Sequence, residues 1–600
     1  MKKLISLAFL FLISFKLFAV IPEDTTQVAE KVYLHVDRSM YTSGEDIWFK
    51  AYVIDPSTNK LSLNTNNLHV ELIAPESEIV QSRIIRVVKG TGHGDFSLPD
   101  SIPSGQYRIR AYTNHMRNYG EEKFFVKEIT IVDPNETDQL QLPVRKIDNK
   151  IDITFFPEGG SLIDNVTSTI GFKAVNALGK GCDVTVKLYS SSGELITIFN
   201  STHLGMGFFN LKPLTGYTYY AIVQGTDGTE IKAPIPASFP AGVTIRTLIT
   251  PDKNLIVTIN TNEATLPSII GKDLNVEVSL RNLVHKTTKL KIDSLVNNFL
   301  IPLADIPDGV LRVTLGVPDG LPLCERLVFL QRNQNERLIV TTDKIEYKPR
   351  EKVSVTIALS GDSTLTDTGY FSMAVVDKKL SDSSAPYSRS ITSWFLLESD
   401  VRGPVEDPGN YFDPDNDKRL QELDLLLLTQ GWRDFKWKYD TLTPFKHEVG
   451  FTLAGQVNRI LNNNPVSGAK INAALFHMNT EEFIDTRTDK DGKFRFEELE
   501  VYGKVRTFLS STGKMENMQG KISVEPIIYN PPPAEKLHRD TASLEITQKE
   551  LASYKQEASY RLNALKKYKL SDTISIGEVT ITATKIEAPQ EVKVRVEYNC

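Results

Sequence analysis

Apolar and polar residues alternate in short runs through the first part of the chain. Examples are residues 32–36, 47–53 and 68–72, and turn-forming clusters such as 42–44 and 55–57 separate them. A period of two is typical of half-buried strands, and turns at this spacing indicate an all-β sandwich. We therefore predict a mainly β fold made of tandem fibronectin- or immunoglobulin-like β-sandwiches, with a helical insertion and a C-terminal helix.

The helical insertion is predicted at 381–437. Within it, Leu420, Leu423, Leu427 and Leu428 fall at helical spacing. A charged amphipathic helix is expected at 548–569, after the stiff linker formed by three prolines at 531–533. The tail at 574–583 is strand-like.

Five positions recur later in the chain at identical spacing. Asp37, Arg38, Tyr41, Glu45 and Ile47 return as Asp343, Lys344, Tyr347, Glu351 and Val353. This indicates a duplicated strand entry into a new sandwich, and chance similarity between two β-rich segments is the alternative. A further strand at 151–155 runs into the glycine-rich residues 156–161, which we interpret as a hairpin turn, since neither a phosphate-loop pattern nor a following helix is present.

The length of 600 residues exceeds what one hydrophobic core supports, so several domains are expected. The patterns predict a signal peptide at 1–19, a first sandwich at 31–135, a second at 148–240, a third at 241–335, a fourth at 336–445 that holds the insertion, a small domain at 446–525, a linker and helix at 526–570, and a further segment at 571–600.

The first 19 residues have the build of a secretory signal peptide. Lys2 and Lys3 precede an apolar run that ends near Phe18, and the small Ala19 follows. The mature chain is then expected to begin near Val20 and to lack a membrane-spanning segment, because no later stretch has about 20 apolar residues. An uncleaved N-terminal anchor is the alternative.

Charge and cysteine content narrow the function classes. The formal net charge of −6 is spread over interspersed acidic and basic residues, which excludes the basic stripe that nucleic-acid binding needs. The three cysteines, Cys182, Cys324 and Cys600, argue against a disulfide framework, although pairing of Cys182 with Cys324 is left open.

The entry around Asp37, Tyr41 and Glu45 resembles the second macroglobulin-type domain of the α2-macroglobulin superfamily. Four later motifs look like a set shared by envelope proteins of the Bacteroidetes: Phe156-Pro-Glu-Gly-Gly, Leu323-Cys-Glu-Arg-Leu-Val-Phe, Ala374-Val-Val-Asp and Leu425-Leu-Leu-Leu-Thr-Gln-Gly-Trp. The resemblance implies a chain of small sandwiches.

The segment 451–499 resembles a carboxypeptidase regulatory-like domain, on the motifs 454–457, 465–469 and 488–494. In that segment we expect a turn at Gly468, a tight hairpin at Asp491-Gly492, and a core formed by Phe494, Phe496 and Leu499. Residues 576–584 resemble the strand that opens a TonB-dependent receptor plug domain. A barrel would need a few hundred further residues, so either the sequence is cut short or this family member has no barrel.

The sequence contains no complete motif of the catalytic classes considered next. None of the cysteines has the Cys-Gly-Glu-Gln context of a macroglobulin thioester. His447-Glu448 lacks the second histidine of a zinc protease motif, because Phe451 stands in its place, and His35 and His69 lie within strand patterns. Ser363 lies in a polar turn without a nucleophile elbow. We therefore predict that the protein is not an enzyme and that it has no catalytic residue and no cofactor.

Two acidic loops have oxygen ligands at alternate positions, which suits calcium. The first holds Asp413, Asp415 and Asp417, and the second holds Asp489 and Asp491. Solvated turns are the alternative interpretation.

The aromatic residues Tyr41, Trp48, Trp432 and Trp437 are candidate partner contacts, and a core role is the alternative for each. The function expected is a non-enzymatic binding scaffold, periplasmic or associated with the outer membrane. Its expected partner is an envelope protein such as a TonB-dependent transporter. The alternatives are the N-terminal portion of a TonB-dependent import receptor and a thioester-less, protease-binding macroglobulin.

Overall fold

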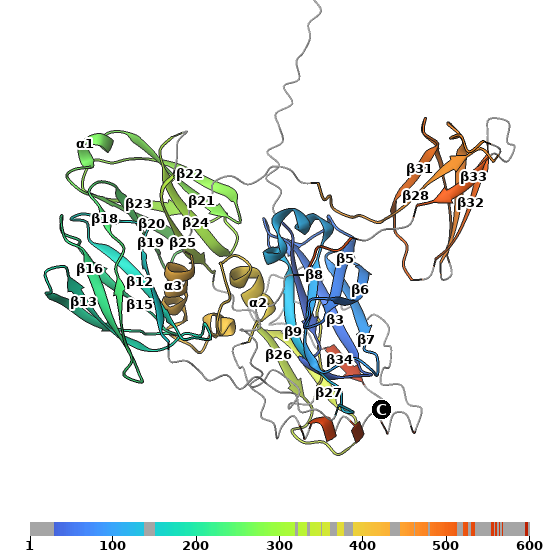
Figure 1. The fold of residues 1–600 in the computed structure, drawn as a ribbon, viewed down its shortest axis with the longest axis horizontal. Coiled ribbons are helices and arrows are strands. Elements are labelled where there is room, and N and C mark those ends of the chain that lie inside the picture. The colour runs from blue at the N-terminus through green and yellow to red at the C-terminus, as the bar shows by residue number, and fades with distance from the viewer. Residues whose placement is uncertain are drawn as a thin grey trace, which may run out of the picture.

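The computed structural model describes residues 29–136, 150–318, 322–332, 337–349, 351–360, 369–376, 388–431, 444–460, 462–477, 480–503, 505–512, 520–525, 530–534, 552, 554–556, 559–560, 563, 567 and 594–597. Its architecture is mainly β, in many small sheets (Figure 1). The predicted fold class, tandem immunoglobulin-like sandwiches, is confirmed. The predicted signal peptide and the plug-like residues 576–584 lie outside the described residues.

The first sandwich packs two sheets face to face. One sheet joins β3 to β1, β4 and β7, and the other has the order β2-β9-β8-β5-β6. Alternate residues of these strands point inward, as in Val32, Leu34 and Val36, and are nearly inaccessible to solvent. The elements are β1 (Lys31–Val36), β2 (Met40–Thr42), β3 (Asp46–Asp55), β4 (Lys60–Leu61), β5 (Asn67–Ile73), β6 (Ile79–Arg86), β7 (Thr91–Ser97), β8 (Gly105–Tyr112), the 3-10 turns η1 (Asn114–Tyr119) and η2 (Glu121–Lys123), and β9 (Phe125–Val132).

The sequence repeat is also a structural repeat. Tyr41 donates to Asp37, and Tyr347 donates to Asp343, each at 2.6 Å. In both copies the backbone N–H eleven residues beyond the aspartate donates to the same carboxylate, at 3.1 and 2.9 Å. The glutamate of each copy accepts the backbone N–H three residues before it. The five matched positions therefore encode one loop that links two antiparallel strands.

The second sandwich contains the sheets β10-β12-β15 and β14-β13-β16-β17 and a short parallel pair, β11-β18. Its elements are β10 (Asp152–Pro157), β11 (Leu162–Ile163), β12 (Ser168–Val175), β13 (Val184–Ser190), β14 (Leu195–Asn200), β15 (Met206–Leu211), β16 (Tyr219–Gly225), β17 (Glu230–Pro234) and β18 (Ser238–Phe239).

The hairpin predicted at 156–161 is wrong. Gly159 and Gly160 do take positive φ, at 84° and 104°. However, β10 pairs with β12 whereas β11 pairs with β18, so the turn carries the chain from one sheet to another.

The third sandwich contains the sheets β19-β20-β23 and β22-β21-β24-β25, and its core is formed by inward-facing aliphatic residues of both. Its elements are β19 (Val243–Ile249), β20 (Asn254–Thr261), α1 (Leu266–Ile269), β21 (Asp273–Leu280), β22 (Leu283–Lys291), β23 (Val296–Pro302), β24 (Gly309–Gly316) and β25 (Pro322–Leu330).

A helical segment follows a three-stranded sheet in which β26 (Arg337–Thr342) pairs with β27 (Ser354–Ser360), and β27 pairs with β34 (Val594–Glu597). The segment consists of α2 (Ile391–Ser393), the π-turn η4 (Trp394–Glu398), the 3-10 turn η5 (Pro408–Phe412) and α3 (Arg419–Gln430). It lies between the first sandwich and the second and third sandwiches (Figure 1).

Helix α3 confirms the helix predicted from leucine spacing. It buries Leu423, Leu427 and Leu428 as expected, together with Leu425 and Leu426. Leu420 is the exception, since it is 54% exposed in the first turn of the helix.

The C-terminal sandwich contains the sheets β31-β28-β33 and β30-β29-β32. Its strands are β28 (Phe451–Asn458), β29 (Lys470–His477), β30 (Thr480–Arg487), β31 (Lys493–Leu499), β32 (Val505–Thr512) and β33 (Lys521–Val524). The predicted core of Phe494, Phe496 and Leu499 is confirmed. Gly468 lies in a turn as predicted, with a positive φ of 72°.

The hairpin predicted at Asp491-Gly492 is wrong, because β30 and β31 belong to different sheets. Farther along the chain, the described residues between 552 and 567 are helical, in agreement with the helix predicted at 548–569.

Candidate functional site

Three buried charges join the first sandwich, the third sandwich and the helical segment. Lys31 lies on β1, Arg281 lies between β21 and β22, and Asp400 follows η4. The Lys31 Nζ lies 2.7 Å from Asp400 Oδ1, and the Arg281 Nε lies 2.9 Å from Asp400 Oδ2. Arg281 also donates to the carbonyl oxygens of Pro56 and Phe395. We call Lys31, Arg281 and Asp400 the clasp.

The turn that presents Arg281 is strained. Leu280 pairs with Leu283, which leaves Arg281 and Asn282 as the two loop residues, with φ of 52° and 69°. A left-handed φ costs a side chain other than glycine roughly 1–2 kcal/mol. The hydrogen bonds of Arg281 to Asp400, Pro56 and Phe395 offset this cost and hold the turn in its left-handed conformation.

Electrostatics favour an ionised carboxylate in the clasp. Burial opposes the ionisation of Asp400, but the charges of Arg281 and Lys31 outweigh it and lower the pKa of Asp400 below its usual value. Burial and the charge of Arg281 lower the pKa of Lys31 well below its usual range, although the Asp400 carboxylate acts in the opposite direction.

Residues of three sequence motifs, at 156–160, 323–329 and 425–432, meet at a second junction, between the second sandwich, the third sandwich and α3. Arg326 on β25 donates to Glu158 at 3.0 Å and to Asp424 of α3 at 2.8 Å. A Cβ added to Gly171 on β12 would lie 2.7 Å from Leu428 Cγ, so glycine is required for helix α3 to pack this closely. The motifs therefore encode a domain junction, which we call the arginine junction.

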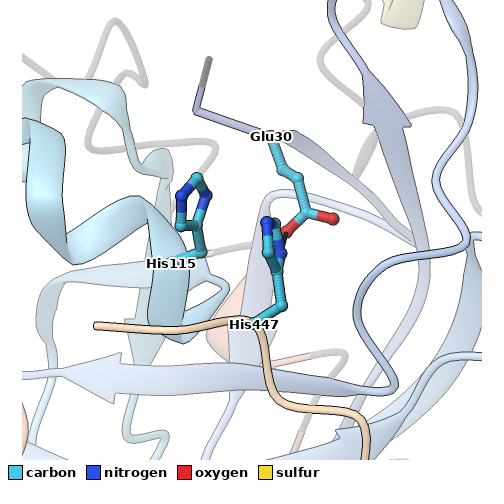
Figure 2. Close-up of side chains that lie close together, drawn as sticks. All are labelled: Glu30, His115 and His447. Atoms are coloured by element: carbon cyan, nitrogen blue, oxygen red, sulfur yellow. Dashed lines mark ion pairs between the residues drawn. The ribbon is translucent and has the colours of Figure 1, made fainter. Parts of the chain in front are cut away.

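A group of potential metal ligands lies on the first sandwich (Figure 2). Glu30 precedes β1, His115 lies in η1, and His447 comes from the extended residues 444–450 that lead to β28. Their ligand atoms all lie within 4.8 Å of one another. The two imidazole rings stack with centroids 4.0 Å apart, and His447 Nδ1 lies 3.4 Å from Glu30 Oε2. We call Glu30, His115 and His447 the histidine cluster.

The protonation of this cluster follows from its burial. Burial opposes the ionisation of Glu30, but hydrogen bonds from His447, Ser62 and Thr65 outweigh it and lower the pKa of Glu30. Burial, assisted by the charge of His447, lowers the pKa of His115 to about 4. At neutral pH the cluster thus holds a carboxylate beside a neutral His115 imidazole.

A cleft of about 420 Å³ lies between the first and C-terminal sandwiches. Arg86 of β6 lies on one side, 2.9 Å from Glu500 and 4.1 Å from the ring centre of Tyr502. The volume falls within the range of about 300–1,000 Å³ that small-molecule sites occupy.

The aromatic residues predicted to contact a partner have different surroundings. Tyr41 is fully buried and hydrogen-bonded within the repeated loop, which agrees with the core alternative. Trp48 is 42% exposed on β3. Trp432 and Trp437 lie outside the described residues.

The predicted calcium ligands serve local turns. Asp413 accepts the backbone N–H of Asp415 at 2.9 Å, and Asp489 accepts those of Asp491 and Lys493. Within the described ranges, Asp413, Asp415 and Asp417 do not gather their carboxylates as the histidine cluster gathers its ligands. Cys182 and Cys324 are both free thiols, and Ser363 lies outside the described residues.

Sequence reasoning missed the histidine cluster. His447 was rejected because the chain near it lacks a second histidine, but His115 lies more than 300 residues away and Glu30 still farther. The one part of the sequence that could have pointed to the cluster is His447-Glu448, a pair of potential metal ligands just before the strand Phe451–Asn458.

Comparison with known proteins identifies one domain. The family described as "MG2 domain" matches residues 31–126. The first sandwich is therefore a macroglobulin-type domain, as the resemblance implied. No curated protein matches the chain.

The solved structures that match the chain include bacterial macroglobulins. Escherichia coli alpha-2-macroglobulin activated by porcine elastase matches with a TM-score of 0.21 and 11% identity, over 83% of this chain and 43% of that one. Salmonella alpha-2-macroglobulin reacted with methylamine matches at 0.16 and 10%, over 83% and 39%. Dimeric latent PorU from Porphyromonas gingivalis matches at 0.23 and 15%, over 50% and 34%. The chain spans less than half the length of each.

Among the described residues, no helix combines the length and apolar character that crossing a membrane requires.

Proposed function

We propose that this chain is an exported, non-enzymatic binding scaffold of the cell envelope that docks to an outer-membrane protein of the TonB-dependent transport class. Export is supported by the signal-peptide pattern at 1–19 and by the macroglobulin-type domain at 31–126. The likeness of residues 451–499 to carboxypeptidase regulatory-like domains and of residues 576–584 to a plug domain supports the choice of partner. The absence of a thioester, nucleophile-elbow or zinc-protease motif from the sequence supports a non-enzymatic role.

The observation that carries the proposal is an aromatic patch on the C-terminal sandwich. Phe483 on β30 and Phe508 on β32 are 70% and 64% exposed. Both rings meet the ring of Phe476 on β29 edge to face, with centroids 6.2 and 5.6 Å apart. Clustered exposed aromatic residues mark protein-binding surfaces, because burying them on association releases a large apolar area from water.

The position of this patch suits docking. The clasp and the arginine junction hold three sandwiches and the helical segment together, whereas the C-terminal sandwich extends away from them (Figure 1). A projecting module with an apolar face can reach a partner while the remaining sandwiches present further edges.

The test is affinity purification of the tagged endogenous protein from gently solubilised outer membranes, with mass spectrometry of the co-purifying chains and of the intact protein. We expect a TonB-dependent barrel protein to co-purify with the wild type and to be lost from the double variant Phe483→Ser/Phe508→Ser. The matched control is Ile198→Ser, which removes an exposed apolar residue of β14 in the second sandwich.

Recovery of a partner-free protein would overturn the docking proposal. An intact mass far above that of this chain would instead favour an import receptor of which this chain is the N-terminal portion. Recovery of a bound protease would favour the protease-binding alternative.

A further inference from the structure

The histidine cluster lies where the chain crosses the first sandwich on its way to the C-terminal sandwich. Residues 444–450, which we call the strap, are held there by polar contacts. The Asn118 side chain donates to the carbonyl oxygen of Phe445 at 2.7 Å. The backbone N–H of Asn66 donates to the carbonyl oxygen of Glu448 at 2.8 Å. His69 Nε2 lies 2.7 Å from the Glu448 carboxylate. His447 therefore approaches Glu30 and His115 from a segment anchored on both sides.

The ligand set has the composition of a transition-metal site. Two imidazoles and one carboxylate suit zinc and related ions, whereas calcium and magnesium prefer oxygen ligands alone. Three protein ligands would leave a fourth position of a tetrahedral ion to water. Figure 2 shows the Glu30 side chain reaching down toward His447, with the His115 ring lying to one side of both.

The distances define what binding would require. Metal–ligand bonds of about 2.0–2.1 Å in a tetrahedral site place ligand atoms about 3.3 Å apart. The present atoms lie within 4.8 Å, and the rings stack with their planes 25° apart. Rotation of one imidazole about its outer side-chain bond would turn a nitrogen lone pair toward the ion, and such torsions have broad energy wells.

Neighbouring hydroxyl groups orient the carboxylate. Ser62 Oγ donates to Glu30 Oε1 at 2.5 Å, and Thr65 Oγ1 donates to Glu30 Oε2 at 2.8 Å. Thr65 Oγ1 also lies 3.1 Å from His447 Nδ1. Hydrogen bonds of this kind fix metal ligands in place and raise affinity. Both hydroxyl groups belong to residues that are almost fully buried.

We propose that Glu30, His115 and His447 bind one divalent transition-metal ion of the zinc class, and that this ion staples the strap to the first sandwich. The ion would join residues more than 300 positions apart and so restrict the motion of the C-terminal sandwich. The alternative is a metal-free histidine stack held by Glu30, which predicts no selective affinity for such ions.

The test is a titration of the full chain, purified without a polyhistidine tag and stripped with a chelator. Co²⁺ is added first, because its visible absorption reports a tetrahedral nitrogen and oxygen environment, and Zn²⁺ is then added as a competitor. We expect one ion per chain, with loss of the Co²⁺ absorption on addition of Zn²⁺. His115→Ala and His447→Ala should each weaken binding by about 100-fold or more, and Thr65→Val by about tenfold.

The matched control is His93→Ala, because His93 is exposed on β7 and lies outside the cluster. It should bind as the wild type does. A second measurement is hydrogen exchange of the strap, which should quicken when the metal is removed and recover when Zn²⁺ is restored.

Two outcomes would overturn the proposal. One is a wild-type chain that binds neither Co²⁺ nor Zn²⁺ in the micromolar range, which needs no variant and therefore does not depend on whether a variant folds. The other is unchanged affinity in the double variant His115→Ala/His447→Ala, which would place the ion elsewhere.

Discussion

Replacing Asp400 by asparagine tests whether the clasp holds the sandwiches together. The change keeps the size of the side chain and removes its charge. It leaves Lys31 and Arg281, whose side chains are 9% and 3% exposed, without their shared carboxylate. Arg281 and Lys31 are then buried without a counter-charge, and the lowered pKa of Lys31 means that this amine escapes the penalty only by releasing its proton.

The magnitude follows from the geometry. At an effective dielectric constant of about 20, each contact of 2.7 or 2.9 Å contributes about 6 kcal/mol of attraction. The desolvation of three ions, at several kcal/mol each, offsets most of that gain in the intact clasp. Removing the carboxylate alone abolishes the attraction but leaves both basic groups buried without a counter-charge. We therefore expect Asp400→Asn to lower the local opening free energy of this region by about 3–5 kcal/mol.

The assay is native-state hydrogen exchange of residues 391–400, because a chain of several domains does not unfold in a single two-state step. The local opening free energy should fall in Asp400→Asn. It should recover in part in Lys31→Met/Asp400→Asn, since that double variant removes one of the two basic groups that lack a counter-charge. The matched control is Asp485→Asn, which breaks an exposed contact of 3.6 Å with Lys470 and should cost about 0–1 kcal/mol. Equal effects of Asp400→Asn and Asp485→Asn would refute the reasoning.

Three further predictions concern the same interfaces. Arg326→Met should lower the opening free energy of α3, measured by hydrogen exchange of its amides, by about 3–5 kcal/mol. Asp424→Asn should lower it by at most about 1 kcal/mol, because Asp424 is 59% exposed. Equal effects of the two variants would contradict this prediction. Gly171→Val should loosen α3, because its Cβ would collide with Leu428, and unchanged protease resistance of the helix would count against it. Since the pKa of Asp400 is lowered on folding, the clasp stabilises the fold above the unfolded pKa of about 3.9 and is lost as the pH falls through the lower folded value; exchange of residues 391–400 in Asp400→Asn should lack this acid-induced change.

The patterns of the sequence predicted local structure well where the signal was periodic. Alternation located the strands, and leucine spacing located α3, because both follow from which face of an element is buried. Leu420 was wrongly placed on the buried face, because periodicity does not show at which residue a helix begins to pack against its neighbour. The repeat around Tyr41 and Tyr347 was recognisable because its hydrogen bonds lie within one loop.

Contacts between distant segments could not be predicted. Both glycine-containing turns were assigned to hairpins because turn residues indicate a reversal of the chain and do not reveal the pairing partner of the next strand. The clasp joins positions 31, 281 and 400, and the histidine cluster joins 30, 115 and 447. No spacing rule connects such positions, since the fold alone brings them together.

The helical segment is synthesised after the three sandwiches that it holds. Until residues 391–430 emerge, Lys31 and Arg281 meet water, and the surfaces of Met206, Val310 and Leu327 that α3 and its neighbours cover are exposed. Each sandwich can form its own core as it is synthesised, but the arrangement of the sandwiches relative to one another is fixed only after the helical segment has formed. A chain interrupted just before α2 would thus consist of folded sandwiches that are not packed against one another and that expose apolar surface. Quality-control proteases could recognise it by that surface.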